Sequence, residues 1–231
     1  MDMVLGERRV ASPRHTLTLC LILLAIAAAG FAQTLLPKNG AAGAPGGAIV
    51  YLPLLAAEWG LFAYVAVGLR RGGVSLKEII SARWTWTSLA LDVLIGLVLL
   101  AAWIGVEFAW TLAPWSNGAA TGTLARQALE VRTAADIPVW IVLSMSAGFV
   151  EELVFRGYLQ RQFGALTKNI PAGLVLQAVL FGVSHGYQGW EPVIRITVFG
   201  LLFGLVARMR KSLRPGMIAH ALVDILGGLT H

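Results

Sequence analysis

Residues 137–159 read IPVWIVLSMSAGFVEELVFRGYL, an apolar run that carries Glu151, Glu152 and Arg156 in its second half. About 20 consecutive apolar residues are enough to cross a bilayer as a helix. An ionisable residue at the centre of such a helix costs about 2.5–3.5 kcal/mol on insertion scales, so three together require partners or a function. The stretch therefore predicts a membrane helix that contributes to a polar site.

The composition predicts that the whole chain is a membrane protein. Of its 231 residues, 57% are hydrophobic and only 13% are charged, whereas a typical soluble domain has about 25% charged residues. Seven apolar segments can be drawn, at residues 16–36, 47–69, 88–110, 137–159, 170–184, 193–207 and 215–229. The expected fold class is all-α: a polytopic membrane helical bundle of about seven transmembrane helices, with an interfacial helix near 75–87.

The last three segments, as drawn, are short. Each corresponds to about 22 Å of helix, less than the ~30 Å hydrocarbon core of a bilayer. Short helices are tolerated when they are packed inside protein. We therefore expect one integrated membrane domain, in which residues 1–136 supply N-terminal helices without a recognisable motif and residues 137–231 form the core that carries the polar site.

The first segment allows two interpretations. Arg8, Arg9 and Arg14 precede it and small residues follow near 30–32, as in a cleavable signal peptide. However, the uncharged stretch 16–36 is long enough to span a membrane, which favours a retained helix.

The distribution of basic residues predicts an orientation. Cytoplasmic loops of membrane proteins carry an excess of Lys and Arg. With the N-terminus in the cytoplasm, the outer segments contain only four of the 18 basic residues: Lys38, Arg126, Arg132 and Arg195. We therefore expect a multi-pass protein of the cell membrane with a cytoplasmic N-terminus. A bacterial origin is a separate expectation. Because the basic residues lie at helix ends, the net charge of +6 does not predict a nucleic-acid partner.

The charged residues of 137–159 have different expected roles. On an α-helix, Glu152 and Arg156 are four residues apart on one face and can form an ion pair. Glu151 is turned by about 100° from its neighbour and remains free to face a cavity. A buried ion network that only holds helices together is the structural alternative.

Two later segments supply histidines. His185 follows Phe181 by one helical turn, and His220 precedes Asp224 by one turn. A carboxylate one turn from an imidazole can fix its tautomer, which supports either a metal-bound or a proton-transferring histidine. Together with the glutamates, these residues predict an active site inside the bundle.

The motifs Glu151-Glu152-x-x-x-Arg156, Phe181-x-x-x-His185 and His220-x-x-x-Asp224 occur in this order on successive membrane segments. They resemble the three motifs of the CPBP family, which comprises type II CAAX prenyl endopeptidases and bacteriocin-processing (Abi) intramembrane proteases. The resemblance covers residues 137–231 and implies an intramembrane endopeptidase.

The resemblance also implies a role for each residue. Glu151 would activate a water that attacks the scissile carbonyl, and His185 would position that water or share its proton. His220 and Asp224 would surround the developing oxyanion, and the ion pair of Glu152 with Arg156 would brace the site.

Asp224 departs from the prenyl endopeptidases, which usually have Asn at this place. An Asn amide can donate a hydrogen bond to an oxyanion, but an ionised Asp cannot. Asp224 is therefore expected to orient His220 or to bind a metal.

The sequence favours a reaction without a cofactor and keeps zinc as the alternative. No His-Glu-x-x-His helix is present. A zinc site could still be completed by His185, His220 and Glu151, with water as the fourth ligand. The arrangement of Glu151, water and His185 is chemically sufficient without metal.

The drawn segments do not bring the motifs to one level. Glu151 lies about 21 Å from the outer end of its helix, and His185 about 22 Å from the inner end of its own. In a ~30 Å slab these levels differ by about 13 Å, a gap that tilted helices, or a fifth helix that begins deeper, around Phe163, would close or widen.

Three further acids lie in the N-terminal segments. Asp92 and Glu107 fall near the ends of 88–110 and are expected to reach interfacial water. Glu58 lies in the middle of its span, where it either pairs with a residue of the core or lines the path of the substrate.

Two other function classes fit the composition. One is a non-enzymatic membrane scaffold or bacteriocin self-immunity factor that keeps the motifs for structure. The other is an ion-coupled transporter, which the absence of internally repeated halves disfavours. The expected partners are a peptide or lipidated-peptide substrate and the lipid bilayer, and the sequence leaves the substrate and the oligomeric state open.

Overall fold

The computed structural model describes residues 8–34, 47–113, 131 and 133–229. The expected end of the first segment at Leu36 lies outside the described residues, and so do Lys38, Arg126 and Arg132.

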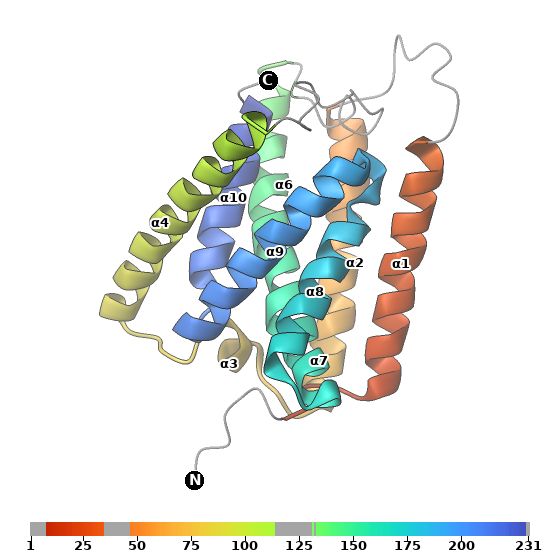
Figure 1. Ribbon diagram of the computed structural model, residues 1–231, viewed down its shortest axis with the longest axis vertical. Helices are drawn as coiled ribbons and strands as arrows, with labels where there is room; N and C mark the ends of the chain where they lie inside the picture. Colours follow the sequence, from red (N-terminus) through yellow and green to blue (C-terminus); the bar gives the residue numbers. More distant parts are fainter. Residues whose placement is uncertain (1–7, 35–46, 114–130, 132, 230–231) are drawn as a thin grey trace.

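The described part of the chain is helical, which confirms the predicted all-α bundle (Figure 1). Its elements are α1 (Pro13–Thr34), α2 (Ala48–Arg71), α3 (Leu76–Ile80), α4 (Trp86–Thr111), α6 (Asp136–Glu151), the π-helix η1 (Glu152–Leu159), α7 (Gln160–Thr167), α8 (Ile170–Ser184), the 3-10 turn η2 (Gly186–Gln188), α9 (Trp190–Arg210) and α10 (Arg214–Leu229). Within these ranges, the strand-like pairing of Ser81 with Ser212 is an isolated bridge.

Five helical stretches are long and apolar enough to cross a membrane: Pro13–Ala32, Ile49–Arg71, Trp86–Thr111, Asp136–Thr167 and Trp190–Arg210. Ile170–Ser184 is a shorter apolar helix. Large apolar side chains such as Leu94 and Phe108 on α4 are exposed, as expected of residues that face lipid. The chain is therefore a multi-pass membrane protein.

The expectation that the sixth segment is short is wrong, because α9 has 21 residues. Its first turns contain charged residues that made the segment seem to begin later. Glu191 accepts a hydrogen bond from Trp110 Nε1 at 2.8 Å, and Arg195 donates one to Glu107 at 2.7 Å. Because both charges have partners on α4, the helix extends back to Trp190.

The interfacial helix is shorter than expected. It is limited to five residues, which Ser75 and Glu78 cap through a reciprocal pair of hydrogen bonds. The end of this helix lies against the turn between α9 and α10, where Leu213 N donates a hydrogen bond to Ile80 O at 2.7 Å.

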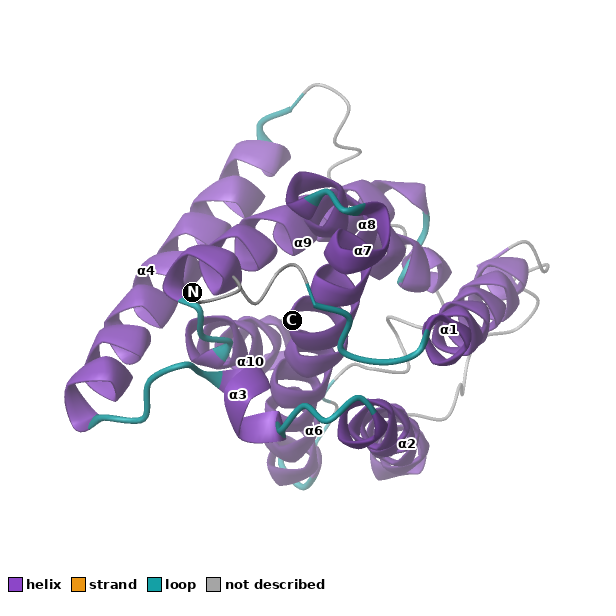
Figure 2. Ribbon diagram, turned by 90° about the horizontal axis from the view of Figure 1, so that it is seen from below, coloured by secondary structure: helices purple, strands orange, loops and turns teal. Residues whose placement is uncertain are grey.

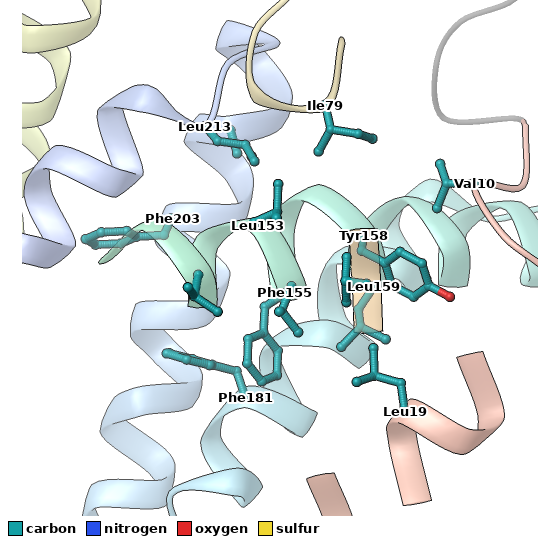
Figure 3. Close-up of a cluster of buried hydrophobic side chains, with 14 of the residues drawn as sticks. Val10, Leu19, Ile79, Leu153, Phe155, Tyr158, Leu159, Phe181, Phe203 and Leu213 are labelled. Atoms are coloured by element: carbon teal, nitrogen blue, oxygen red, sulfur yellow. The ribbon is translucent and has the colours of Figure 1, made fainter. Parts of the chain in front are cut away.

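The helix with the three charges occupies the middle of the bundle. Viewed from below, α6 lies between α10 and α2 and packs against both (Figure 2). All eight residues of η1 are buried. Apolar side chains from several other elements, including Leu19, Ile79, Phe181 and Leu213, surround this segment (Figure 3).

Glycines allow the helices of this core to approach one another closely. A Cβ on Gly148 of α6 would lie 2.8 Å from Met217 O of α10. A Cβ on Gly200 of α9 would lie 2.8 Å from Ala178 Cα of α8. Since real Cβ atoms do not approach this closely, the two glycines set how near these helices lie.

The continuous helix α6–η1–α7 accounts for the meeting of the motifs. The predicted 13 Å difference in level is wrong, because the helix does not end at residue 159 but continues through α7 to Thr167. Glu151 is 167 − 151 = 16 residues before the end of α7, and His185 is 185 − 170 = 15 residues after the start of α8. These are nearly equal lengths of helix, and α7 packs against α8, so the two residues reach similar heights above the turn.

Candidate active site

Glu151 is the centre of a cluster of acids and histidines. Its Oε2 lies 4.0 Å from His185 Nε2 and 3.7 Å from His220 Nε2. This oxygen is buried and has no hydrogen-bond partner among the described residues, while the Glu151 side chain as a whole is 22% exposed. A carboxylate that is accessible and lacks a direct hydrogen bond can act on a water or a substrate.

Three carboxylates surround the imidazole of His220. Its Nδ1 lies 3.2 Å from Glu152 Oε1, whereas its Nε2 faces Glu151 and lies 3.6 Å from Asp224 Oδ2. The edge of the ring is also held by Phe199, whose centroid is 5.0 Å away. Of the three carboxylates, that of Glu152 thus lies closest to a nitrogen of His220.

Arg156 stabilises Glu152 from the other side. Its Nη1 is 3.3 Å from Glu152 Oε1, and both side chains are completely buried. The guanidinium makes no well-aligned hydrogen bond within the described ranges; instead it lies 4.2 Å from the ring centroid of Phe181. Aromatic faces attract a desolvated cation, so the charge is balanced by one carboxylate and by aromatic rings, with Phe199 and Phe203 further away.

The backbone fixes the tautomer of His185. This residue ends α8, and its Nδ1 lies 2.8 Å from Phe181 O. A carbonyl oxygen can only accept, so Nδ1 carries the hydrogen and donates it. The neutral ring then presents the lone pair of Nε2 towards Glu151. The spacing Phe181-x-x-x-His185 is explained by this contact and by the edge-to-face packing of the two rings at 4.8 Å.

The residues considered for zinc do not fit a metal ion in this arrangement. Within the described ranges, no group of three or more His, Cys, Asp or Glu side chains has a geometry that could hold one. The Nε2 atoms of His185 and His220 lie 4.0 Å and 3.7 Å from the same oxygen of Glu151.

Glu58 has a partner that the sequence did not identify. Ser146 Oγ of α6 donates a hydrogen bond to Glu58 Oε2 of α2 at 2.6 Å. Ser146 precedes Glu151 by five residues, and Glu58 lies within electrostatic range of both Glu151 and Asp224. Glu58 is thus paired with the core helix at the edge of the acid cluster.

The expectation that Asp92 reaches interfacial water is wrong, because its side chain is completely buried. It accepts hydrogen bonds from Arg210 at 2.7 Å, from Arg214 at 2.6 Å and from Ser212 at 2.9 Å. These bonds tie α4 to the turn between α9 and α10. Glu107, by contrast, is partly exposed and pairs with Arg195.

The structure is thus a multi-pass helical bundle with a glutamate and two histidines gathered inside it, an arrangement that makes these residues candidates for an active site. Residues 133–226 match the family described as type II CAAX prenyl endopeptidase Rce1-like. All six residues singled out from the three motifs lie within that match. The C-terminal part of the chain is therefore similar to this family, in agreement with the resemblance of its motifs.

A similar curated protein is the "Uncharacterized protein YpbD" of Bacillus subtilis (strain 168). The two are 33% identical over 88 residues, which cover 38% of this chain and 43% of that protein. The chain therefore matches less than half of the length of this relative. No solved structure matches the chain significantly.

Proposed function

We propose that the protein is an intramembrane endopeptidase that hydrolyses a peptide bond of a membrane-associated substrate through a water activated by Glu151. The observation that carries the proposal is the position of Glu151 Oε2, which is buried and flanked by Nε2 of His185 at 4.0 Å and of His220 at 3.7 Å. These separations exceed a direct hydrogen bond and suit groups that interact through a water.

In this reaction Glu151 removes a proton from the water, and the oxygen attacks the scissile carbonyl carbon. The lone pair of His185 Nε2 accepts the second hydrogen of the water and directs its oxygen, because Nδ1 is already bound to Phe181 O. As the tetrahedral intermediate collapses, the C–N bond breaks and Glu151 returns its proton to the leaving amine.

The oxyanion requires a donor, and His220 is the residue placed to provide one. When its ring carries both hydrogens, Nδ1 donates to Glu152 and Nε2 faces the reaction centre beside Glu151. Asp224 lies at the edge of this group, 3.6 Å from His220 Nε2, and acts through His220. Arg156 acts further back, by holding Glu152 in place through their ion pair.

A scaffold that keeps the motifs only for structure is the second candidate, and the surroundings of Glu151 favour the enzyme. Its side chain is 22% exposed, and it faces two histidine nitrogens at separations that suit an intervening water. Because the matched family is described as a CAAX prenyl endopeptidase, the substrate class to test first is a peptide from the C-terminal end of a CAAX-type or other lipidated protein.

The test compares cleavage of a quenched peptide library by the detergent-purified protein and by two variants, Glu151→Gln and His185→Ala. We expect kcat to fall at least about a hundredfold in each, the lower limit for general acid–base catalysis, while the melting temperature stays unchanged. Glu78→Gln is the matched control, because it is exposed and Gln also completes a capping box. Equal activity in Glu151→Gln would reject the mechanism, and a folded but inactive wild type would favour the scaffold or transporter.

Chelation tests the zinc alternative in the same assay. Full activity after exhaustive dialysis against a chelator is expected. Loss of activity that is restored by zinc alone would replace the proposed mechanism by a metal-dependent one.

A further inference from the structure

A cavity of about 340 Å³ lies between the first turns of α1 and the last turns of α2, away from the acid–histidine cluster. It is lined by Ser12, Arg14, His15, Thr18, Tyr64, Gly68 and Arg71. The volume falls within the ~300–1,000 Å³ typical of small-molecule sites. Figure 1 shows that the lower ends of α1 and α2 lie at the same end of the bundle as α3.

The cavity is positively charged. Its lining contains two arginines and no Asp or Glu. Both arginines are exposed residues, and in the part of the chain that the structure describes neither side chain has a hydrogen-bond or ion-pair partner. By contrast, the arginines at 195, 210 and 214 all donate to a carboxylate. The start of α1 adds the partial positive charge of a helix N-terminus.

The floor of the cavity is fixed by the ring of His15. It stacks on Tyr64 with 4.0 Å between the centroids, and its nitrogens contact Tyr158 Oη at 3.0 Å and Tyr64 O at 3.1 Å. Gly68 leaves room for this ring, because a Cβ there would lie 2.5 Å from His15 Cε1. Since the ring nitrogens of His15 are used, Arg14 and Arg71 are the groups left to bind a ligand.

An exposed apolar surface continues from the cavity along α1. Leu17 and Leu21 follow Arg14 by three and seven residues, so they lie on the same face of the helix. They are 60% and 57% exposed. On α2, the exposed Val67 lies one turn from Arg71. A ligand bound by the arginines would thus lie beside an exposed apolar surface. A free ion would make no use of this surface, whereas a ligand with a hydrocarbon chain would.

We infer that this cavity binds the phosphate of an anionic phospholipid, whose acyl chains lie along Leu17 and Leu21. Guanidinium groups bind phosphate oxygens through paired, charge-assisted hydrogen bonds. Basic pockets between membrane helices at the positively charged end of a protein are suited to such headgroups. The site is independent of the proposed peptidase reaction, because none of its lining residues belongs to the acid–histidine cluster.

The test measures the Kd of a fluorescent phosphatidylglycerol for the detergent-purified full chain, with fluorescent phosphatidylcholine as the neutral lipid. The double variant Arg14→Gln/Arg71→Gln is expected to bind phosphatidylglycerol roughly ten- to thirtyfold more weakly. The control Arg9→Gln/Arg70→Gln removes the same charge from exposed residues that do not line the cavity and should bind like the wild type.

A second variant guards against loss of folding. Thr18→Phe fills the cavity without a change of charge and should weaken phosphatidylglycerol binding while the melting temperature is retained. Equal weakening by both arginine double variants would overturn the site in favour of a general charge effect. Equal affinity for phosphatidylcholine would overturn the role of the phosphate charge, and displacement by inorganic phosphate at equal concentration would overturn the lipid in favour of a free anion.

Discussion

Nδ1 of His220 lies 3.2 Å from Oε1 of Glu152, so the second glutamate of the adjacent pair orients the histidine that the first glutamate faces. The same oxygen of Glu152 is 3.3 Å from Arg156. The two neighbouring glutamates therefore have separate structural positions: Glu152 is buried between a cation and an imidazole, whereas Glu151 is 22% exposed and faces His185 and His220.

Glu152→Gln should lower both stability and activity. The substitution leaves Arg156 as a completely buried cation without a carboxylate partner, and breaking one side of such a pair costs about 3–5 kcal/mol. Denaturant titration followed by circular dichroism measures the loss. Glu151→Gln provides the comparison, because we expect it to abolish cleavage with little change in unfolding. Equal stability of the two variants would contradict the division of roles.

Asp224→Asn should retain activity. Glu152 is closer to His220 than Asp224 is, at 3.2 Å against 3.6 Å, and an Asn amide can also donate to an oxyanion. We expect kcat/KM to stay within about tenfold of the wild-type value, at the mild end of the range for an outer-shell substitution. A complete loss of cleavage in a folded variant would show that the carboxylate of Asp224 takes part directly.

Asp92→Asn should destabilise the bundle without changing the arrangement of the acid–histidine cluster. Two arginines and Ser212 share this buried carboxylate, so its removal is expected to cost about 3–5 kcal/mol. Glu107→Gln is the matched control, since the ion pair with Arg195 is partly exposed and worth about 0–1 kcal/mol. Thermal unfolding of both variants in the same detergent gives the comparison, and similar melting temperatures would refute it.

Gly148→Ala should reduce activity by moving helices. The new Cβ would lie 2.8 Å from Met217 O, so α6 and α10 must separate and Glu151 must shift from His220. Overpacking of this kind costs about 1–3 kcal/mol. Gly105→Ala on α4 is the control, because nothing lies within 4 Å of its Cβ position, and it should gain up to about 1 kcal/mol of helix propensity. Unchanged cleavage by Gly148→Ala would mean that the close approach is not needed.

Much of this architecture is readable from the sequence. Hydrophobic runs of spanning length predict the bundle, and the spacing of Glu152 and Arg156 predicts their ion pair, because both depend on local periodicity. The extent of α9 is less visible, since the charges of Glu191 and Arg195 conceal its first turns until their partners on α4 are known.

The misjudged features depend on contacts distant in sequence. The burial of Asp92 requires that α9 and α10 bring Arg210 and Arg214 to it. The bond between Glu152 and His220 joins residues 220 − 152 = 68 positions apart. The shared level of Glu151 and His185 requires the length of α7, which contains polar residues such as Gln162 that hid it from a hydropathy pattern. Gln162 is nevertheless buried, because it bonds the backbone at Val10 and Ala11.

The geometry of the site depends on the number of residues in the π-helical segment at 152–159. Its wider hydrogen-bond ring, i→i+5, accommodates residues that a regular α-helix would place differently. Each residue added to or removed from a helix turns everything beyond it by about 100°. A one-residue deletion there would turn Glu151 relative to Gln162. The side chain of Gln162 holds the segment before α1 by accepting a hydrogen bond from Val10 N. Insertions and deletions in this stretch would therefore move the site residues relative to one another, so evolutionary change within it should proceed at constant length.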